Sequence, residues 1–332
     1  MSIKVALCSS WHVHAQEYAE EILTNSDAEL AGIWDGGDLA GNLGVPNISN
    51  LEDILCDESI NGVLITAPTT AHEEIITACA KAGKHIFTEK VLTPDISSAK
   101  RVTDRIKDSG KYFCISFPYR TYQEYLFGKG AIDSGLLGEL TSIRFHKSHD
   151  GLSSGWLPQS FLNPNESGGG AMLDLGCHGM YIILWIAGMP DSIQSIFNYS
   201  NGFGADDNSI SVMHYLDGCI ASNETSFIAH GSATQLIITG TQGCIIIGGP
   251  NGGVWAKLNS NNDWKEIKNL PPPLPSAISQ WISAIKYNDN TIGKILIDKP
   301  YPFALIKLFD PEFSVFKDKT LKINNNNVEI IS

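Results

Sequence analysis

The feature that most constrains this fold is a regular alternation of strand and helix patterns over the first 120 residues. Short apolar runs typical of buried strands recur between segments of helical periodicity, and the connections are short. Strands are predicted over 3–7, 29–35, 62–65, 85–88 and 112–116. Helices are predicted over 15–23, 51–56 and 71–82, and a further helix is predicted to begin with Thr93 as N-cap and Pro94 as first residue. This alternation predicts a Rossmann-type, doubly wound parallel sheet that binds ligands outside the carboxyl ends of its strands.

The pattern changes after about residue 119. A predicted helix over 121–134 and a strand over 140–149 lead into a long loop over 150–167. Strand-like segments then follow one another with tight turns between them, over 192–198, 209–215, 219–227, 235–239 and 244–247. We therefore expect two domains, 1–119 and 120–332, of which the second is α+β with a large, mainly antiparallel open sheet.

Charge and composition argue against several classes of partner. The formal net charge is −13 and Lys and Arg form no cluster, so no nucleic-acid partner is expected. The apolar start of the chain is too short for a signal peptide, and the longest uncharged run, 175–190, falls short of a membrane span. Seven cysteines without a C-x-x-C pair indicate reduced thiols in a cytoplasmic protein. No membrane partner is expected.

A glycine-led helix in the second half carries two ionisable groups. The glycines at 168–170 precede Asp174 and His178, which are spaced i and i+4, and the apolar run 180–187 follows. This spacing puts both groups on one helical face, where a carboxylate and an imidazole can act as a general acid/base pair. The alternative is a capped core helix in which Asp174 favours the positive N-terminal end and His178 makes an ordinary hydrogen bond. Between them, Cys177 is expected to be a small buried residue and not a nucleophile.

The turn after the first strand lacks the G-x-G-x-x-G fingerprint of dinucleotide-binding domains. Its small residues still allow backbone N–H groups to approach a pyrophosphate at a helix N-terminus, and His12 is expected beside the phosphates. His12 and His14 together suggest a metal site, but no further ligand has suitable spacing, so no metal is expected. Asp35 ends the second strand, where a carboxylate can bind the ribose hydroxyls; a plain turn residue is the alternative.

Several segments together resemble the glucose–fructose oxidoreductase/inositol dehydrogenase (Gfo/Idh/MocA) family. They are Thr88-Glu89-Lys90-Val91, Ala67-Pro68-Thr69-Thr70-Ala71-His72 and the block 168–178. The resemblance implies an NAD(P)-dependent oxidoreductase that transfers hydride between a nicotinamide cofactor and a hydroxyl or carbonyl carbon of a sugar, inositol or related polyol. It also implies a homo-dimer or homo-tetramer built on the open sheet. The strand-like segments carry more apolar surface than one layer of helices can cover, which supports a contact between copies of the chain. Examples are Ile210, Val212, Ile220, Ile237 and Ile245.

The resemblance assigns catalytic roles to three residues. The family's Glu-Lys-Pro motif matches Glu89-Lys90, with Val91 in place of Pro, and its Asp-x-x-x-His block matches Asp174 and His178. Lys90 is then expected to polarise the reacting oxygen and His178 to act as general base, although which of the two takes the proton stays open. Asp174 is expected to hold a substrate hydroxyl and to fix the imidazole.

The remaining site predictions form two sets. Cofactor-binding residues are expected at Cys8, Ser9, Ser10, His12, Val13, Asp35, Thr66, Ala67, Pro68, His72, Glu89 and Lys90. The substrate is expected to contact Lys90, Asp174 and His178 and a wall formed from Tyr119, Arg120, His149 and Trp156, although a structural role is equally expected for each of these four. NAD is expected in preference to NADP, because Asp35 and the nearby Asp38 repel a 2′-phosphate and no adjacent Lys or Arg receives one.

A function from a different class remains open. Some proteins of this fold bind a dinucleotide and a protein partner without catalysing a reaction, and the glycine-free turn permits such a sensor. Lys90, Asp174 and His178 argue against it, because a sensor has no chemical need for these three groups.

Overall fold

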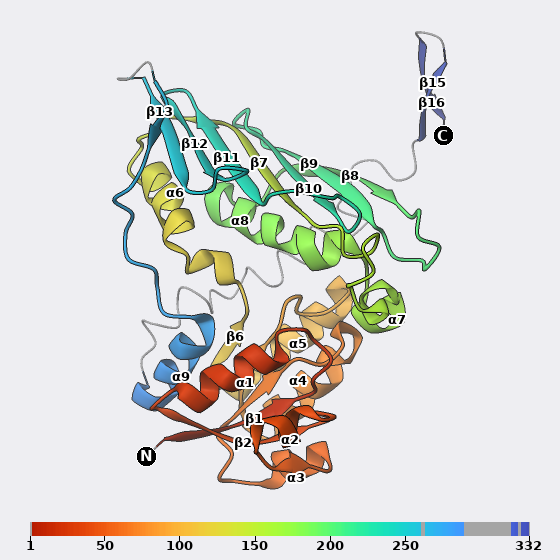
Figure 1. The fold of residues 1–332 in the computed structure, drawn as a ribbon, viewed down its shortest axis with the longest axis vertical. Coiled ribbons are helices and arrows are strands. Elements are labelled where there is room, and N and C mark those ends of the chain that lie inside the picture. The colour runs from red at the N-terminus through yellow and green to blue at the C-terminus, as the bar shows by residue number, and fades with distance from the viewer. Residues whose placement is uncertain (1, 260–262, 289–319, 325–326, 332) are drawn as a thin grey trace.

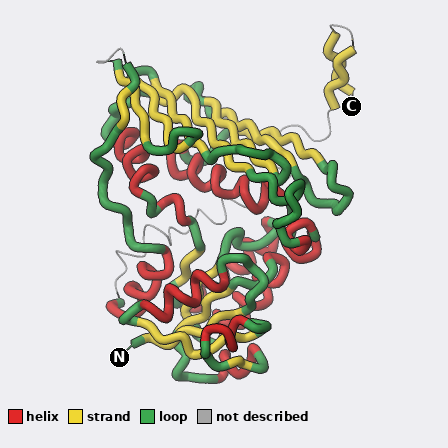
Figure 2. Tube along the Cα trace, in the orientation of Figure 1, coloured by secondary structure: helices red, strands yellow, loops and turns green. Residues whose placement is uncertain are grey.

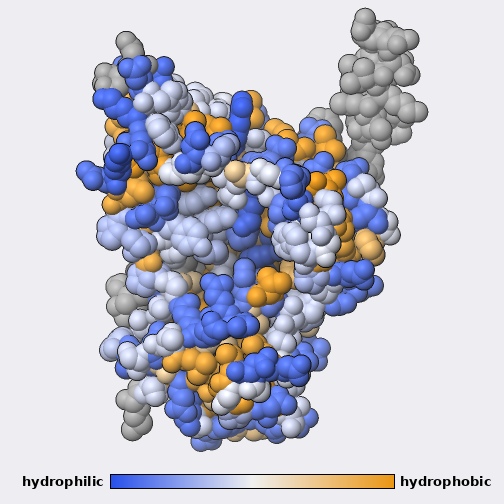
Figure 3. All heavy atoms as spheres, viewed as in Figure 1, coloured by the Kyte–Doolittle hydropathy of each residue, from blue (hydrophilic) through white to orange (hydrophobic). Residues whose placement is uncertain are grey.

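The computed structural model describes residues 2–259, 263–288, 320–324 and 327–331 (Figures 1 and 2). Two layered units lie one above the other, an N-terminal unit in red and orange and a second unit in yellow to cyan (Figure 1). Strands β15 (Thr320–Asn324) and β16 (Asn327–Ile331) form a separate hairpin. Hydrophilic residues cover much of the face seen in Figure 3, with apolar patches between them.

The N-terminal unit contains the parallel sheet that the alternating pattern predicts. Its six strands are ordered β3-β2-β1-β4-β5-β6, and every neighbouring pair is parallel. The strands are β1 (Ile3–Cys8), β2 (Ala28–Trp34), β3 (Asn47–Ile48), β4 (Gly62–Ile65), β5 (His85–Thr88) and β6 (Phe113–Ile115). The helices are α1 (Ala15–Thr24), α2 (Leu39–Leu43), α3 (Leu51–Cys56), α4 (His72–Lys81) and α5 (Ile96–Ser109). The strand order reverses between β1 and β4, which is where doubly wound sheets bind their ligands.

One helix of this unit begins later than predicted. Thr93 and Pro94 do not open α5; its N-cap is Asp95, whose carboxylate accepts a hydrogen bond of 2.9 Å from the Ser98 N–H. Asp is among the strongest N-caps because it satisfies an amide that the helix leaves unpaired. The carboxylate of Asp95 therefore sets the start of the helix, in place of the preceding proline.

The second unit is built on a sheet of eight strands in the order β14-β13-β12-β11-β7-β10-β9-β8. Neighbouring strands are antiparallel except for the central pair β7 and β10, which is parallel. The strands are β7 (Leu140–Ser148), β8 (Ser192–Asn198), β9 (Asn208–His214), β10 (Ile220–Ser226), β11 (Gln235–Gly240), β12 (Gly243–Gly248), β13 (Val254–Leu258) and β14 (Lys265–Glu266). The mainly antiparallel sheet is confirmed, and β13 and β14 extend it beyond the predicted strands.

Helices cover one face of this sheet. Figure 1 shows α6 (Gln123–Asp133) and α8 (Cys177–Ala187) beneath it. In the central strands alternate residues point to these helices and are buried. Ile143, Ile238 and Ile245 are among them and lie opposite one another in register. Ile245 therefore lies on the covered face, not on the surplus apolar surface to which the sequence assigned it. Val212 and Ile220 do lie on the open face and are exposed.

Helix α9 (Ala277–Tyr287) returns to the N-terminal unit. Its Trp281 is buried against Phe87, with ring centroids 5.9 Å apart. Gly62 makes room for this ring, since a Cβ at Gly62 would lie 2.7 Å from it. The sequence assigned 277–287 to the second domain, yet this helix packs on the first sheet; the boundary between 119 and 120 stays a prediction.

The apolar stretch in the second unit is a core helix. The segment Pro164–Ala187 spans 24 residues and contains α7 (Pro164–Ser167), a π-helical turn (Met172–Gly176) and α8, with a mean hydropathy of 1.4 in its most apolar window. The uncharged run 175–190 overlaps this longer segment, which also contains Glu166 and Asp174 and is long and apolar enough to cross a membrane by length and composition only. However, 72% of that window is buried inside the protein, which is how the core helix of a globular protein passes the same test.

Candidate active site

A cleft between the two units collects several predicted site residues. The empty space between its lining residues, including space open to solvent, is about 280 Å³. The residues that line it are Trp11, His12, Thr69, Lys90, Val91, Phe161, Ser167, Gly169, Leu173 and Asp174. They come from the carboxyl end of the parallel sheet on one side and from the glycine-led segment on the other, so both units contribute.

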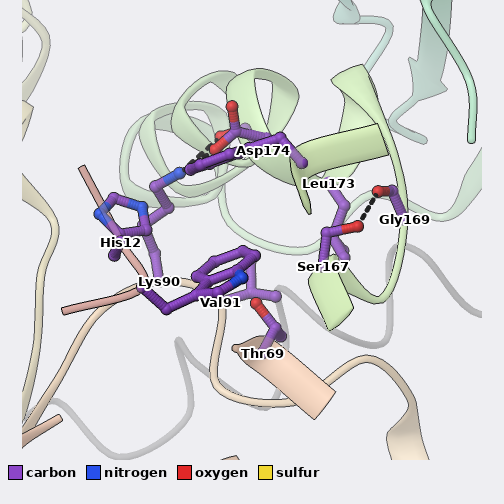
Figure 4. Close-up of a pocket in the computed structure, with 10 residues that line it drawn as sticks. His12, Thr69, Lys90, Val91, Ser167, Gly169, Leu173 and Asp174 are labelled. Atoms are coloured by element: carbon purple, nitrogen blue, oxygen red, sulfur yellow. Dashed lines mark hydrogen bonds and ion pairs between the residues drawn. The ribbon is translucent and has the colours of Figure 1, made fainter. Parts of the chain in front are cut away.

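Lys90 and Asp174 join the two units by an ion pair. The Lys90 ammonium donates to the Asp174 carboxylate, and to its backbone carbonyl oxygen at 3.0 Å (Figure 4). Burial opposes both charges, but their mutual attraction outweighs it, so the pKa of Lys90 lies above its usual value and that of Asp174 below. Lys90 is therefore held as an ammonium ion inside the cleft.

The backbone of Lys90 is also fixed. Its N–H donates a 2.7 Å hydrogen bond to Oε2 of the buried Glu89, and the Lys90–Val91 peptide bond is cis. Glu89 thus positions the residue that forms the ion pair.

His178 is buried and uncharged. Its Nδ1 lies 3.0 Å from the Tyr181 hydroxyl, which in turn accepts a 3.2 Å hydrogen bond from the Tyr119 N–H. Burial first, and then the charges of Lys147 and Lys90, lower the pKa of His178 well below 6.5. The expectation that Asp174 fixes this imidazole is wrong within the described residues. Its carboxylate binds the Lys90 ammonium, which attracts it more strongly than a neutral ring does.

Lys147 is a cation in this region that sequence reasoning missed. Its Nζ donates a 2.7 Å hydrogen bond to the Tyr119 hydroxyl, and the Tyr119 ring centroid is 5.1 Å from that of His178. The signal was present in the sequence: along β7, Ile143, Phe145 and Lys147 alternate onto the same covered face. Because lysine is almost never buried unless it is paired, a lysine at an inward position of such a strand indicates a polar partner inside the protein.

The four predicted wall residues lie in different surroundings. Tyr119 lies beside His178 as described, and Arg120 is buried with its guanidinium 5.2 Å from the Trp185 ring. His149 packs against the exposed Trp156 at 4.6 Å, and Asp174 and Lys147 act electrostatically on it. Tyr119 and His149 are thus close to the charged groups of the cleft, whereas Arg120 packs in the core.

The turn after β1 keeps a glycine-like backbone without glycine. Ser9 has φ +75° and Asp35 has φ +55°, both in the left-handed region. The Ser9 hydroxyl donates to Asp35 Oδ2 at 2.9 Å, and Trp11 N–H donates to the same hydroxyl oxygen at 3.2 Å. A left-handed conformation costs a non-glycine residue about 1–2 kcal/mol, and these hydrogen bonds offset part of that cost.

Most amides of this turn are bonded within the protein. The N–H groups of Ser9, Ser10 and His12 donate to the carbonyl oxygens of Trp34, Asp35 and Thr66 at 2.7, 3.1 and 3.1 Å. The Val13 N–H has no acceptor among the described residues, and the Val13 side chain is exposed. The turn therefore offers a ligand fewer free amides than its small side chains suggested.

Two of the predicted cofactor residues are buried away from the crevice. The Cys8 side chain is fully buried within the sheet. The His72 ring nitrogens lie 3.0 Å from the Val91 carbonyl oxygen and 3.1 Å from that of Ala67, so this histidine joins the segments after β4 and β5. The side chains of both residues are thus engaged inside the first unit, and their contact with a cofactor stays a prediction.

Trp11 and Phe161 connect the units above the cleft. Their rings stack with centroids 4.9 Å apart, and Trp11 Nε1 donates to Glu166 at 2.9 Å. The sequence assigned 150–167 to an irregular loop, yet it contains a 3₁₀ turn (Gln159–Leu162) and α7. Phe161 and Glu166 were therefore overlooked.

Two family models match the chain on either side of the cleft. Residues 4–117 match the oxidoreductase family with an NAD-binding Rossmann fold, and residues 126–246 match the GFO/IDH/MocA C-terminal domain. The chain belongs to the Gfo/Idh/MocA family. The resemblance drawn from the sequence is confirmed, and this is a family of NAD(P)-dependent oxidoreductases.

Curated relatives of this family member are distant. Levoglucosan dehydrogenase of Pseudarthrobacter phenanthrenivorans is 25% identical over 254 residues, which is 68% of this chain and 64% of the relative. D-xylose 1-dehydrogenase (NADP(+)) 2 of Haloferax volcanii is 27% identical, over 65% of this chain and 64% of the relative. Scyllo-inositol 2-dehydrogenase (NAD(+)) of Bacillus subtilis is 26% identical, over 59% and 57%. The matches thus span less than two thirds of these relatives' own lengths.

Solved structures share the fold over nearly the whole chain. Levoglucosan dehydrogenase in complex with NADH and levoglucosan has a TM-score of 0.77 at 20% identity, and the match covers 92% of this chain and 95% of that one. GenD2 from gentamicin A biosynthesis, in complex with NAD, has a TM-score of 0.75 at 19% identity, covering 94% and 93%. At these identities the likeness supports the two-unit architecture of this Gfo/Idh/MocA protein.

The cofactor of the family fits this chain at both ends of the crevice. Asp35 is exposed at the end of β2, where a ribose can be bound, and Lys90 lines the cleft at the end of β5. Between them, the Ser10 hydroxyl and the Val13 N–H would be the donors for the phosphates of a bound cofactor. This member of the family thus has an acid and a lysine at the two ends of the crevice, and fewer free amides between them than a glycine fingerprint offers.

Proposed function

We propose that this chain is an NAD-dependent dehydrogenase or reductase acting on a hydroxyl or carbonyl carbon of a sugar, inositol or related polyol. The observation that carries the proposal is the ion pair of the buried Lys90 with the partly buried Asp174 in the cleft, together with the uncharged His178 on which the charge of Lys90 acts. The distant relatives that are named for levoglucosan, xylose and scyllo-inositol support the substrate class.

Different residues of the chain polarise the reacting oxygen and accept its proton. NAD, when bound, accepts the hydride from the alcohol carbon. Lys90 polarises the oxygen as an ammonium ion, because its pairing with Asp174 keeps it protonated and so leaves proton transfer to another group. Neutral His178 accepts the hydroxyl proton at Nε2 when Nδ1–H is directed to Tyr181. Asp174 holds Lys90 and offers its carboxylate to a neighbouring substrate hydroxyl.

The preference for NAD over NADP belongs to the same proposal. The carboxylate of Asp35 is exposed at the ribose end, and Asp38 adds a second negative charge within three residues. A 2′-phosphate brought to this end of the crevice meets repulsion, whereas ribose hydroxyls find an acceptor.

The decisive experiment is a turnover assay on the purified full-length chain. Sugars, inositols and polyols are offered with NAD or NADP, and cofactor reduction is followed by absorbance. The expected result is NAD-dependent oxidation of at least one compound, which is lost in Lys90→Met and retained in Lys129→Met, a lysine that pairs with Asp133 on the outer helix α6. Absence of turnover with every compound and both cofactors would refute the proposal.

One observation favours a second candidate, a dinucleotide sensor without catalysis. The bonded amides of the turn after β1 indicate weaker cofactor binding than a glycine-rich turn gives. Isothermal titration with NAD separates the candidates: saturable binding combined with no turnover across the panel favours the sensor, whereas turnover excludes it.

We further propose that the open face of the eight-stranded sheet joins copies of this chain in a homo-dimer or homo-tetramer. Ile196, Val212 and Ile220 are exposed there at 69%, 41% and 52%, and no helix covers them within the described residues. Light scattering after size exclusion should give a multiple of the 36.1 kDa chain mass. Ile220→Lys should shift the protein toward the monomer, while Leu23→Lys on α1 should leave the mass unchanged.

A further inference from the structure

A group of three metal-binding side chains lies at the carboxyl edge of the parallel sheet. His12 and His14 come from the turn after β1, and Glu89 follows β5. One potential ligand atom from each lies within 4.8 Å of the others. The sequence showed no third ligand, because Glu89 is far along the chain and only the parallel pairing of strands brings it to the histidines.

We propose that His12, His14 and Glu89 bind one divalent transition-metal ion, with Zn²⁺ as the fitting occupant. Two imidazoles and one carboxylate are donors that zinc accepts, with a water as the fourth ligand. The site adjoins the cleft, because His12 lines it and Glu89 accepts the Lys90 N–H, but no step of the reaction proposed above requires a metal.

The distances support a site that is nearly formed. Glu89 Oε1 lies 2.9 Å from His14 Nδ1 and 3.9 Å from His12 Nδ1. Neighbouring ligand atoms around tetrahedral zinc are about 3.3 Å apart, as follows from bond lengths near 2.0–2.1 Å. Shifts of about half an ångström at each histidine would therefore bring both Nδ1 atoms to this separation from Glu89 Oε1.

The surroundings of the carboxylate support the same assignment. Glu89 is 1% exposed and His12 is 5% exposed, so two of the three donors are shielded from water. Glu89 Oε2 accepts the Lys90 N–H, and the Tyr18 hydroxyl contacts Oε1 while lying 2.7 Å from the Ser116 hydroxyl. Metal ligands are commonly held by such neighbouring hydrogen bonds, which fix their orientation.

The half-buried His14 gives an ion a path to the site. Its side chain is 40% exposed, whereas those of its two partners are almost closed to solvent. His12 Nδ1 accepts the His14 N–H at 3.2 Å in the metal-free arrangement, and the ion would replace this weak contact. A metal bound here would tie the glycine-free turn to the end of β5, where the Lys90 backbone is held.

The test uses the full-length chain stripped with a chelator and then dialysed against metal-free buffer. Zn²⁺ is titrated by calorimetry and bound metal is counted after gel filtration, while Co²⁺ serves as a spectroscopic probe of histidine ligation. We expect one ion per chain and a rise in the thermal midpoint on Zn²⁺ addition. Because the readout is metal content and not turnover, the result does not depend on the proposed oxidoreductase activity.

Matched variants decide which residues bind the ion. His14→Gln and His12→Gln should each weaken Zn²⁺ affinity at least tenfold. His230→Gln should leave it unchanged, because the exposed His230 pairs with Asp150, at 2.6 Å, and belongs to no group of three metal-binding side chains among the described residues. Failure of the wild-type chain to take up either Zn²⁺ or Co²⁺, or unchanged affinity in both His12 and His14 variants, would overturn the proposal. If a variant does not fold, wild-type stoichiometry and the Co²⁺ spectrum decide the matter alone.

Discussion

The two ends of the cleft differ in how closely they follow the family. At the reaction end, Lys90, Asp174 and His178 are all present, and the first two form a partly buried ion pair between the units. At the cofactor end, the turn after β1 has no glycine, and its amides donate mostly to the protein itself. The chain therefore retains the groups that proton transfer needs. The turn that usually binds a pyrophosphate through free amides has most of its amides bonded within the protein.

This difference shows which requirement is geometric and which is chemical. Proton transfer and polarisation of an oxygen need particular functional groups, so a substitution removes the function. A turn needs a backbone conformation, and Ser9 adopts with φ +75° what glycine would adopt more easily. The predictions that follow test each end separately.

The largest expected effect is at the reaction end. His178→Ala removes the proposed proton acceptor and should lower turnover about 10²–10⁴-fold, with NAD affinity nearly unchanged. Lys90→Ala should cost a similar factor, and the double variant should lose much less than the product of the two losses, because the groups act together. Steady-state kinetics with calorimetry of NAD binding measures both quantities. Fully additive losses in the double variant would contradict a shared site.

The next effect is at the cofactor end and concerns selectivity. Asp35→Ser removes the charge that opposes a 2′-phosphate and should move the ratio of NADP to NAD affinity toward NADP by roughly tenfold, the equivalent of about 1.4 kcal/mol. Titration of both cofactors against wild type and variant measures this shift. Glu29→Ser, at an exposed position early in β2, is the control that keeps the net charge change the same. Wild-type protein that binds NADPH as tightly as NADH would refute the role of Asp35.

The fold was more predictable than the site, for a physical reason. Alternating strand and helix patterns depend on local periodicity, so the parallel sheet and most strand bounds followed from the sequence. The helix start at Asp95 was missed because Thr93 and Asp95 are both suitable N-cap residues and lie two positions apart. The hydrogen bond from the Ser98 N–H to Asp95 identifies Asp95 as the N-cap. Helix α9 was missed as a part of the first unit because its packing on Phe87 is a long-range contact.

From the sequence, only those site residues that belong to a recognised motif could be assigned. The motifs place Lys90 and Asp174 close enough to form an ion pair, whereas the site that these two share with His178 stays a prediction. The partner of the imidazole was not predictable, because the choice between Asp174 and Tyr181 depends on which group the Lys90 ammonium attracts. Glu89 beside His14 was equally hidden, because strands distant in sequence bring the two together.

A smaller effect isolates the backbone strain at the turn. Ser9→Gly and Ser9→Ala both remove the hydroxyl that binds Asp35 and Trp11, so the difference between them reports the left-handed conformation alone. The glycine variant should be more stable than the alanine variant by about 1 kcal/mol in chemical denaturation. Equal stability of the two would show that the turn relaxes and that Ser9 carries no strain.

The smallest effect comes from a histidine at the opposite, amino end of the parallel sheet, which serves as a reference for a purely structural imidazole. His85 Nδ1 accepts the Tyr112 N–H at 3.0 Å, and burial, with the charge of Lys111, lowers the pKa of His85 to about 4. Below pH 6.5 the unfolded chain binds a proton that the folded His85 does not, so stability should fall as the pH drops from 6.5 toward 4. The slope of the free energy of unfolding from one such group is at most about 1.4 kcal/mol per pH unit, and the partial exposure of His85 reduces this to about half.

His85→Asn keeps an acceptor for the Tyr112 N–H without a titrating ring, so the stability of this variant should depend less on pH than that of wild type. The control is His214→Asn, a change at an exposed position of β9, which should keep the pH dependence of wild type. Denaturation midpoints at several pH values measure the slopes, and parallel curves for wild type and His85→Asn would mean that His85 does not contribute.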